Sequence, residues 1–160
     1  MSDSLWGNLE TLMKKNTPKT ILLEQANHLQ SATNGMLVVK IDSQGDIKGD
    51  IVHRMIVYVP ALNNYKYKLL SISHKLSIYP LTIHHPIEGV AVPDEQKFEI
   101  ELGKIFKSKP VRKALEALLL QARDMQMDEH TDDDEKSNGS VNGSVKEREK
   151  TNSRHASALA

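Results

Sequence analysis

Hydrophobic and polar positions follow a helical period at both ends of the chain and an extended period in the middle. Near the start, residues 4–15 carry a stripe with the spacing of an amphipathic helix, formed by Leu5, Trp6, Leu9, Leu12 and Met13. A second helix is predicted to begin at Thr17, a good N-cap followed by Pro18, and to end at Asn34-Gly35. Its inward face would comprise Leu22, Ala26 and Leu29, with Ile21 beside it.

From residue 36 the period changes from 3.6 to 2, which predicts two β-hairpins. In the first, residues 36–42 and 47–59 are strands joined by a turn at residues 44–46. The second strand has one apolar parity, made of Ile47, Ile51, Met55, Val57 and Val59. After a turn at Asn63-Asn64, the second hairpin pairs residues 65–73 with 76–83 across His74-Lys75.

Two further helices are predicted after a loop that runs from Pro86 to Pro93. Residues 97–103 fit either a strand or a helix, and helix is preferred because Asp94 precedes them as an N-cap. The last helix begins near Ser108 and Pro110. Its inward side would comprise Val111, Ala114, Leu115, Leu118, Leu119 and Ala122.

Composition divides the chain at about residue 127. Leu, Ile, Val and Phe make up about a third of residues 1–127 but only about a tenth of residues 128–160. The second part also holds an acidic run and a repeated NGSV string, so it is predicted to be a disordered tail. The fold expected for residues 1–127 is one globular α+β domain, in which a four-stranded antiparallel meander lies between two N-terminal and two C-terminal helices (α-α-β-β-β-β-α-α).

The formal charge is +0 and cysteine is absent, which excludes disulfides, thiol catalysis and thiolate metal sites. The N-terminus lacks the pattern of a secretory signal, and no apolar run is long enough to span a bilayer. The sequence therefore predicts a soluble, cytoplasmic protein with no membrane partner. It leaves the oligomeric state open.

Sequence motifs for catalysis and cofactor binding are missing. No G-x-S-x-G string marks a serine nucleophile, and the scattered glycines form no phosphate-binding loop. Asp50 and His53 would lie on opposite faces of a strand, as would the adjacent His84 and His85. The sequence thus predicts no catalytic, cofactor-binding or metal-binding residues and favours a protein that is not an enzyme.

Two cationic features raise nucleic-acid binding as an alternative. The run Tyr65-Lys66-Tyr67-Lys68 interleaves aromatic and basic residues. The predicted junction of the last two helices adds Lys104, Lys107, Lys109, Arg112 and Lys113. The spacing disfavours this alternative, because on a strand the two tyrosines and the two lysines emerge from opposite faces.

All four tyrosines, Tyr58, Tyr65, Tyr67 and Tyr79, fall in the predicted sheet region, where they could pack on the sheet or form an interface. The favoured hypothesis is a non-catalytic module that binds another protein through the open face or an edge of its sheet. The other alternative is a small-molecule site or an enzyme, assembled between sheet and helices from residues such as His53, His84 and Glu88.

Overall fold

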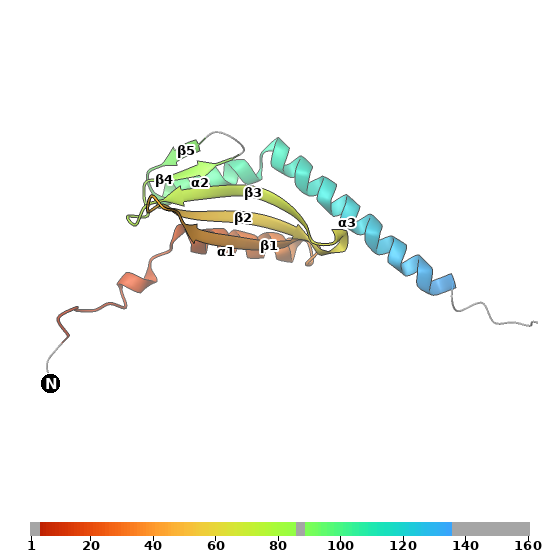
Figure 1. The fold of residues 1–160 in the computed structure, drawn as a ribbon, viewed down its shortest axis with the longest axis horizontal. Helices are drawn as coiled ribbons and strands as arrows, with labels where there is room; N and C mark the ends of the chain where they lie inside the picture. Colours follow the sequence, from red (N-terminus) through yellow and green to blue (C-terminus); the bar gives the residue numbers. More distant parts are fainter. Residues whose placement is uncertain (1–3, 86–88, 136–160) are drawn as a thin grey trace, which may run out of the picture. The chain divides into compact units, whose positions relative to one another are not determined.

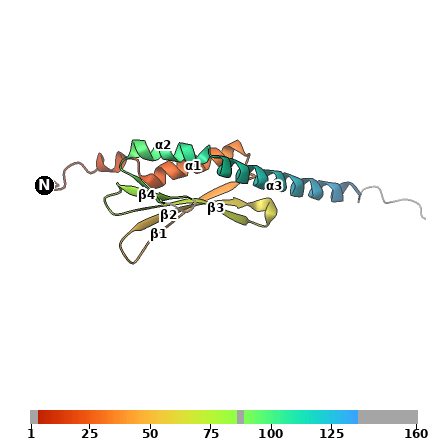
Figure 2. The ribbon, with the colours of Figure 1, turned by 90° about the horizontal axis from the view of Figure 1, so that it is seen from above.

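The structure, a computed structural model, describes residues 4–85 and 89–135. It shows an α+β fold in which one antiparallel sheet has helices on one of its faces (Figures 1 and 2). The chain divides into two units, Met1–Gln126 and Met127–Ala160, and the first is described below. The elements are η1 (Leu12–Lys14), α1 (Pro18–Ala32), β1 (Val38–Gly45), β2 (Ile51–Val59), η2 (Pro60–Leu62), β3 (Tyr65–His74), β4 (Leu81–His84), β5 (Gly89–Val92), α2 (Glu95–Phe106) and α3 (Lys109–Glu135).

Helix α1 has the ends that the sequence predicts. The Thr17 side-chain oxygen accepts a hydrogen bond from the Thr20 backbone N–H at 3.2 Å, and Pro18 occupies the first turn. At the other end Asn34 and Gly35 have φ angles of 51° and 78°, the left-handed conformation that stops a helix. The prediction for this helix is confirmed.

The first hairpin forms, but its turn lies later than predicted. The Asp46 side chain accepts hydrogen bonds from the backbone N–H groups of Lys48 and Asp50 at 2.8 and 2.9 Å. These bonds organise a turn over residues 46–50, whereas residues 44–46 were expected. Ile47, assigned above to the apolar side of a strand, is instead fully exposed in this turn.

The sheet has five strands in the order β1-β2-β3-β4-β5, so the prediction of four strands is wrong. The fifth strand, β5, occupies part of the region that was expected to be a loop. It pairs with β4 where Gly89 lies opposite His84, and a Cβ at Gly89 would come within 2.8 Å of the Thr82 methyl group. Because a side chain at residue 89 would collide with Thr82, this pairing requires glycine. The strand that starts there has four residues, which is too few to show a clear alternation of apolar and polar residues in the sequence.

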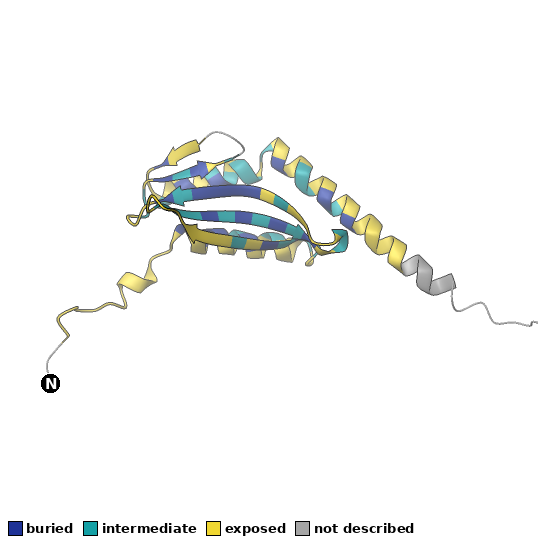
Figure 3. Cartoon of the chain, in the orientation of Figure 1, coloured by how far each residue is buried: buried dark blue, intermediate teal, exposed yellow. Residues whose placement is uncertain are grey.

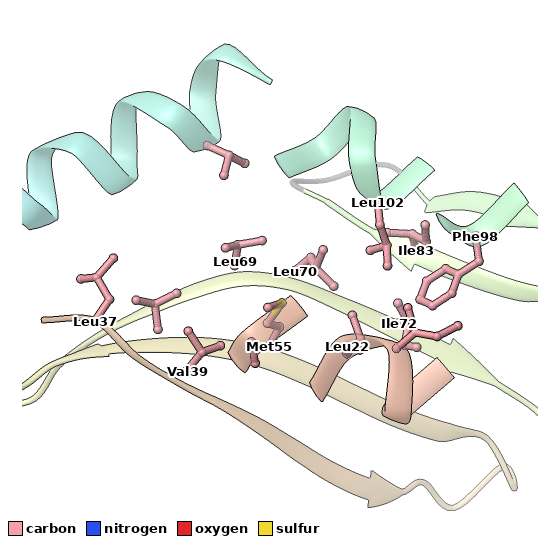
Figure 4. Close-up of a cluster of buried hydrophobic side chains, with 14 of the residues drawn as sticks. Leu22, Leu37, Val39, Met55, Leu69, Leu70, Ile72, Ile83, Phe98 and Leu102 are labelled. Atoms are coloured by element: carbon pink, nitrogen blue, oxygen red, sulfur yellow. The ribbon is translucent and has the colours of Figure 1, made fainter. Parts of the chain in front are cut away.

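A β-bulge in β3 shapes the core. Met55 pairs with Leu70 while Ile56 pairs with Lys68, so Leu69 is an extra residue in β3. Two residues of a bulged strand oppose one residue of its partner, which interrupts the alternation of side chains. Leu69 and Leu70 are both buried in the core with Leu22 of α1 and Phe98 of α2 (Figure 4).

The helix predicted over residues 4–15 does not form, so one N-terminal α-helix is present where two were expected. Only Leu12–Lys14 make a single 3-10 turn, and Figure 3 shows this N-terminal segment as exposed. Trp6 is 80% exposed. Gly7 has a φ of 67°, and the Asn8 side chain accepts a hydrogen bond from the Glu10 N–H. Both features oppose a helix, and the apolar stripe has no surface to pack against.

Both C-terminal helices form. The Asp94 carboxylate accepts a hydrogen bond from the Lys97 N–H at 2.8 Å, so residues 97–103 belong to α2 as preferred. Helix α3 buries Val111, Leu118 and Ala122 on the predicted side. It continues to Glu135, so residues 128–135, which were assigned to the disordered tail, are helical; the remainder of that prediction lies outside the described residues.

The contrast between the buried core and the exposed N-terminal segment can be tested by two truncations. We expect Phe98→Ala to lower the free energy of unfolding by about 3–5 kcal/mol, because Phe98 is fully buried. We expect Trp6→Ala to change it by less than about 0.5 kcal/mol. Urea denaturation followed by circular dichroism measures both values. A large cost for Trp6→Ala would show that the N-terminal stripe does pack on the domain.

Candidate functional site

The sheet face opposite the helices is covered by no element of the described residues (Figure 2). On β2 the buried residues alternate with Val52, Arg54, Ile56 and Tyr58, which point to this face and keep part of their surface exposed (Figure 3). We call this side the open face. Its other members, assigned from strand register, are Val38, Lys40, Asp42 and Gln44 on β1, Lys66, Lys68, Ser71 and Ser73 on β3, and Thr82 and His84 on β4.

Tyr58 lies at the centre of a cationic patch on the open face. The Lys40 ammonium lies 5.1 Å from the centroid of the Tyr58 ring, and that of Lys66 lies 5.5 Å from it. Both distances fit cation–π contacts. Ile56 is paired with Lys40 on one side and with Lys68 on the other. The result is an apolar and aromatic centre flanked by three lysines.

The open face carries an excess of positive charge. Its one described acid, Asp42, is paired with Arg54 at 3.3 Å, and Arg54 also donates a hydrogen bond to Gln44. Lys40, Lys66 and Lys68 are exposed and form no ion pair with any residue that the structure describes. Their charges are therefore available to a negatively charged partner.

The four tyrosines proposed as interface residues are not on one surface. Only Tyr58 lies on the open face. Tyr67 pairs with Val57 and packs against the core from the helix side, and Tyr65 shares that side with 55% of its surface exposed. Tyr79 lies in the loop between β3 and β4 and also packs against the core. An extended aromatic patch on the open face is therefore not formed.

The hydroxyl of Tyr79 is buried and has no hydrogen-bond partner among the residues that the structure describes. Burial raises the pKa of Tyr79 to about 12, and the nearby carboxylates of Glu95, Glu99 and Asp94 add to this rise. An unpaired buried hydroxyl costs stability, by about 1–3 kcal/mol for such groups. Tyr79 is thus a packed core residue rather than an exposed contact residue.

The two cationic features considered for nucleic acid lie on different sides of the sheet. The register of β3 directs Lys66 and Lys68 to the open face. Lys107, Lys109 and Lys113 lie at the α2–α3 junction and in α3, and Figure 2 shows these helices on the other side of the sheet. Lys104, also in that layer, is paired with Glu101 at 3.0 Å. One nucleic-acid strand lying on the open face could not contact both groups, so the combined site inferred from the sequence is not assembled.

The histidines of the proposed small-molecule site do not meet. His53 pairs with Ile72 on the helix side, whereas His84 pairs with Ser71 on the open face, where its Nε2 lies 2.9 Å from Ser73 Oγ. The sheet therefore separates the two rings, and the cluster of His53, His84 and Glu88 is wrong in this respect. Glu88 lies outside the described residues.

His53 instead belongs to a hydrogen-bonded chain that the sequence did not reveal. Its Nδ1 lies 2.8 Å from Ser43 Oγ, and its Nε2 lies 3.1 Å from His74 Nε2. His74 Nδ1 donates to the Lys75 carbonyl oxygen at 2.8 Å. In the neutral pair, His74 Nε2 therefore accepts a hydrogen bond from His53 Nε2–H, and His53 Nδ1 accepts a hydrogen bond from the Ser43 hydroxyl. The order is that of a nucleophile, a base and an orienting group.

Burial lowers the pKa of His53, and the neighbouring His74 and Lys19 add to the effect. Both histidine side chains are buried, at 6% and 8% exposure. Burial therefore favours the neutral form of His53, in which Nδ1 can accept a hydrogen bond. Within residues 4–85 and 89–135 no group of three or more metal-binding side chains gathers at one point.

Comparison with protein-family models, with curated proteins and with solved structures found no match to this chain in any of the three. No helix in the described parts of the chain combines the length and the hydrophobicity needed to cross a bilayer.

The lowered pKa of His53 makes stability depend on pH. Below about pH 6.5, His53 binds a proton more readily in the unfolded chain than in the folded chain. Protonation therefore favours the unfolded state, and the free energy of unfolding decreases as the pH falls. We expect the free energy of unfolding to fall less steeply between pH 7 and pH 5 in His53→Asn than in the wild type. Urea titrations across this range measure the slope, and equal slopes would contradict the assignment.

Proposed function

We propose that this protein is a non-catalytic, cytoplasmic interaction module that binds an acidic segment of another protein on the open face of its sheet. The observation that carries the proposal is the Tyr58 patch, in which Lys40, Lys66 and Lys68 surround Tyr58 and Ile56 on an uncovered surface. Apolar and aromatic groups can supply contact area, and the lysines can supply charge complementarity.

Charge and geometry favour an acidic protein segment over two other occupants. A second copy of this chain would bring one cationic open face against another, and like charges across an interface cost several kcal/mol. A single-stranded nucleic acid would need several aromatic platforms, whereas the open face presents only Tyr58 among the described tyrosines, with lysines above its ring. An acidic segment needs neither feature.

The edge of the sheet offers a second way to hold such a segment. Strand β1 is a terminal strand of the sheet, is eight residues long, and carries Lys40 on its open-face side. Unpaired backbone groups on an edge strand can pair with an extended peptide. A peptide added at β1 would lie next to the Tyr58 patch, so contacts with the edge and with the face are compatible.

The test is reversal of the patch charge in the full chain. We expect Lys40→Glu/Lys66→Glu/Lys68→Glu to lose binding of poly-L-glutamate, and of any acidic protein recovered from cell lysate and then purified, by at least about tenfold. All three lysines are exposed, so the variant should fold. Calorimetric titration at 150 mM salt measures the affinities.

A matched control reverses three exposed lysines of the helical layer, Lys107→Glu/Lys109→Glu/Lys113→Glu. The proposal requires this variant to bind as the wild type does. Equal loss in both variants would show that only net charge matters and would overturn the proposal. Tighter binding of poly(dT) than of poly-L-glutamate, with the steep salt dependence of phosphate contacts, would favour nucleic acid instead.

A second candidate function, acyl transfer, has one specific observation in its favour. Ser43 is exposed, and its hydroxyl donates a hydrogen bond to a buried histidine that is oriented by a second histidine. In such a reaction Ser43 Oγ would attack the carbonyl carbon of an ester while His53 takes the hydroxyl proton. His53 would then return this proton to the departing alcohol, and water would release the acyl group.

This candidate is tested with a fluorophosphonate, which labels an activated serine with loss of fluoride. If Ser43 is nucleophilic, the wild-type protein becomes labelled at Ser43, and labelling falls at least about a hundredfold in His53→Gln. The control is Ser73→Ala, which removes the other serine that contacts a histidine and should leave labelling unchanged. Absence of labelling in the folded wild type would reject the enzyme reading.

A further inference from the structure

A cavity of about 280 Å³ opens between α1, the α2–α3 junction and the helix side of the sheet. Its floor is formed by Met55 and by Leu69, the extra residue of the bulge, which are 1% and 2% exposed. Figure 4 shows both side chains in the core between α1 and α3. The volume is just below the usual range for sites of drug-sized ligands, about 300–1,000 Å³, so only a small ligand fits.

The wall of the cavity is apolar, formed by Leu29, Ala32, Phe106 and Leu115. Polar groups among the lining residues are limited to Gln25, His28 and Arg112. His28 and Arg112 are exposed, so they lie at the rim rather than at the floor. A half-open, mainly apolar hollow with a few polar groups at its rim fits a ligand with a polar head and an apolar body.

The positive charge of Arg112 at the rim favours a ligand with a negatively charged head group. The Arg112 guanidinium forms no ion pair with the residues that the structure describes. The nearby carboxylates Glu24 and Glu99 line a separate hollow between α1 and α2. A guanidinium binds a carboxylate through two parallel hydrogen bonds. A phosphate monoester carries close to two charges and would call for a second cation.

We propose that this cavity binds a small amphipathic carboxylate, such as a medium-chain fatty acid. The apolar body lies against Leu29, Phe106 and Leu115, above the buried Met55 and Leu69. The carboxylate binds Arg112, with Gln25 and His28 as further hydrogen-bonding groups. This site lies on the helix side of the sheet and does not depend on the Tyr58 patch.

Octanoate is the probe, and the Met55 methyl group is the reporter. In the full chain with ¹³C-labelled methionine methyl groups, octanoate should shift the Met55 resonance in a saturable way and leave Met13, which is 83% exposed, unchanged. Arg112→Gln should weaken binding by about tenfold or more, because a charge-assisted hydrogen bond is lost. Ala32→Trp, at an exposed lining position, should abolish binding by filling the entrance.

Matched controls and ligands separate a specific site from general association. Lys113→Gln and Ala117→Trp make the same chemical changes on exposed residues outside the lining, and both should bind octanoate as the wild type does. Acetate lacks the apolar body and octylamine has the opposite charge, so neither should shift Met55. The proposal is overturned if octanoate leaves the Met55 resonance unmoved up to its solubility limit. It is equally overturned if Arg112→Gln and Ala32→Trp bind octanoate as well as their controls do.

Discussion

Burial of one face of a five-stranded sheet under helices is the constraint on which the rest of the structure depends. Leu22 of α1 and Phe98 of α2 are fully buried together with Met55, Leu70 and Ile72 of the central strands. Each buried side chain of this size contributes about 1.5–3 kcal/mol through removal from water. Successive residues of a strand point to opposite faces of the sheet. The residues that are buried beneath the helices therefore determine which residues lie on the open face. Arg54, Ile56 and Tyr58 reach the open face because His53, Met55 and Val57 are held beneath the helices.

The same constraint separates the candidate functions in space. The Tyr58 patch lies on the open face, whereas the Ser43–His53–His74 chain and the cavity between α1 and the α2–α3 junction lie on the helix side. The bulge links the two sides. It places Leu69 beside Leu70 on the helix side, at the floor of the cavity. Lys68 and Ser71, on either side of these two leucines in sequence, point to the open face. A strand without the extra residue would change the side on which one half of β3 presents its side chains, and either Lys68 or Leu70 would then be misplaced.

Local signals in the sequence were sufficient to predict elements whose ends are set by nearby residues. Helix α1 is bounded by Thr17 and Gly35, α2 starts at the Asp94 cap, and the parity of β2 follows from its apolar alternation. The failures depend on distant partners. The N-terminal stripe has helical spacing, but none of its apolar side chains packs against the core of the described residues. Strand β5 forms where Gly89 packs closely against Thr82 of β4, a contact between strands that the local sequence does not show. The His53–His74 contact joins residues on two strands whose register is shifted by the bulge, so spacing along the chain could not reveal it.

For the candidate sites, the sequence supplied residue types but not their arrangement. The Tyr65–Lys68 run correctly implied that tyrosines and lysines separate, yet the aromatic partner of Lys66 is Tyr58 on the neighbouring strand. The cavity shows the same limit more strongly, since its lining comes from α1, β2, β3, α2 and α3 and contains no motif. Arg112 is exposed at the rim of this cavity, and the residue before it, Val111, is buried in the core. Successive residues of a helix point in directions about 100° apart, so burial of Val111 directs Arg112 toward the side of α3. The position of this charge thus depends on how α3 packs in the core, which spacing along the chain does not reveal.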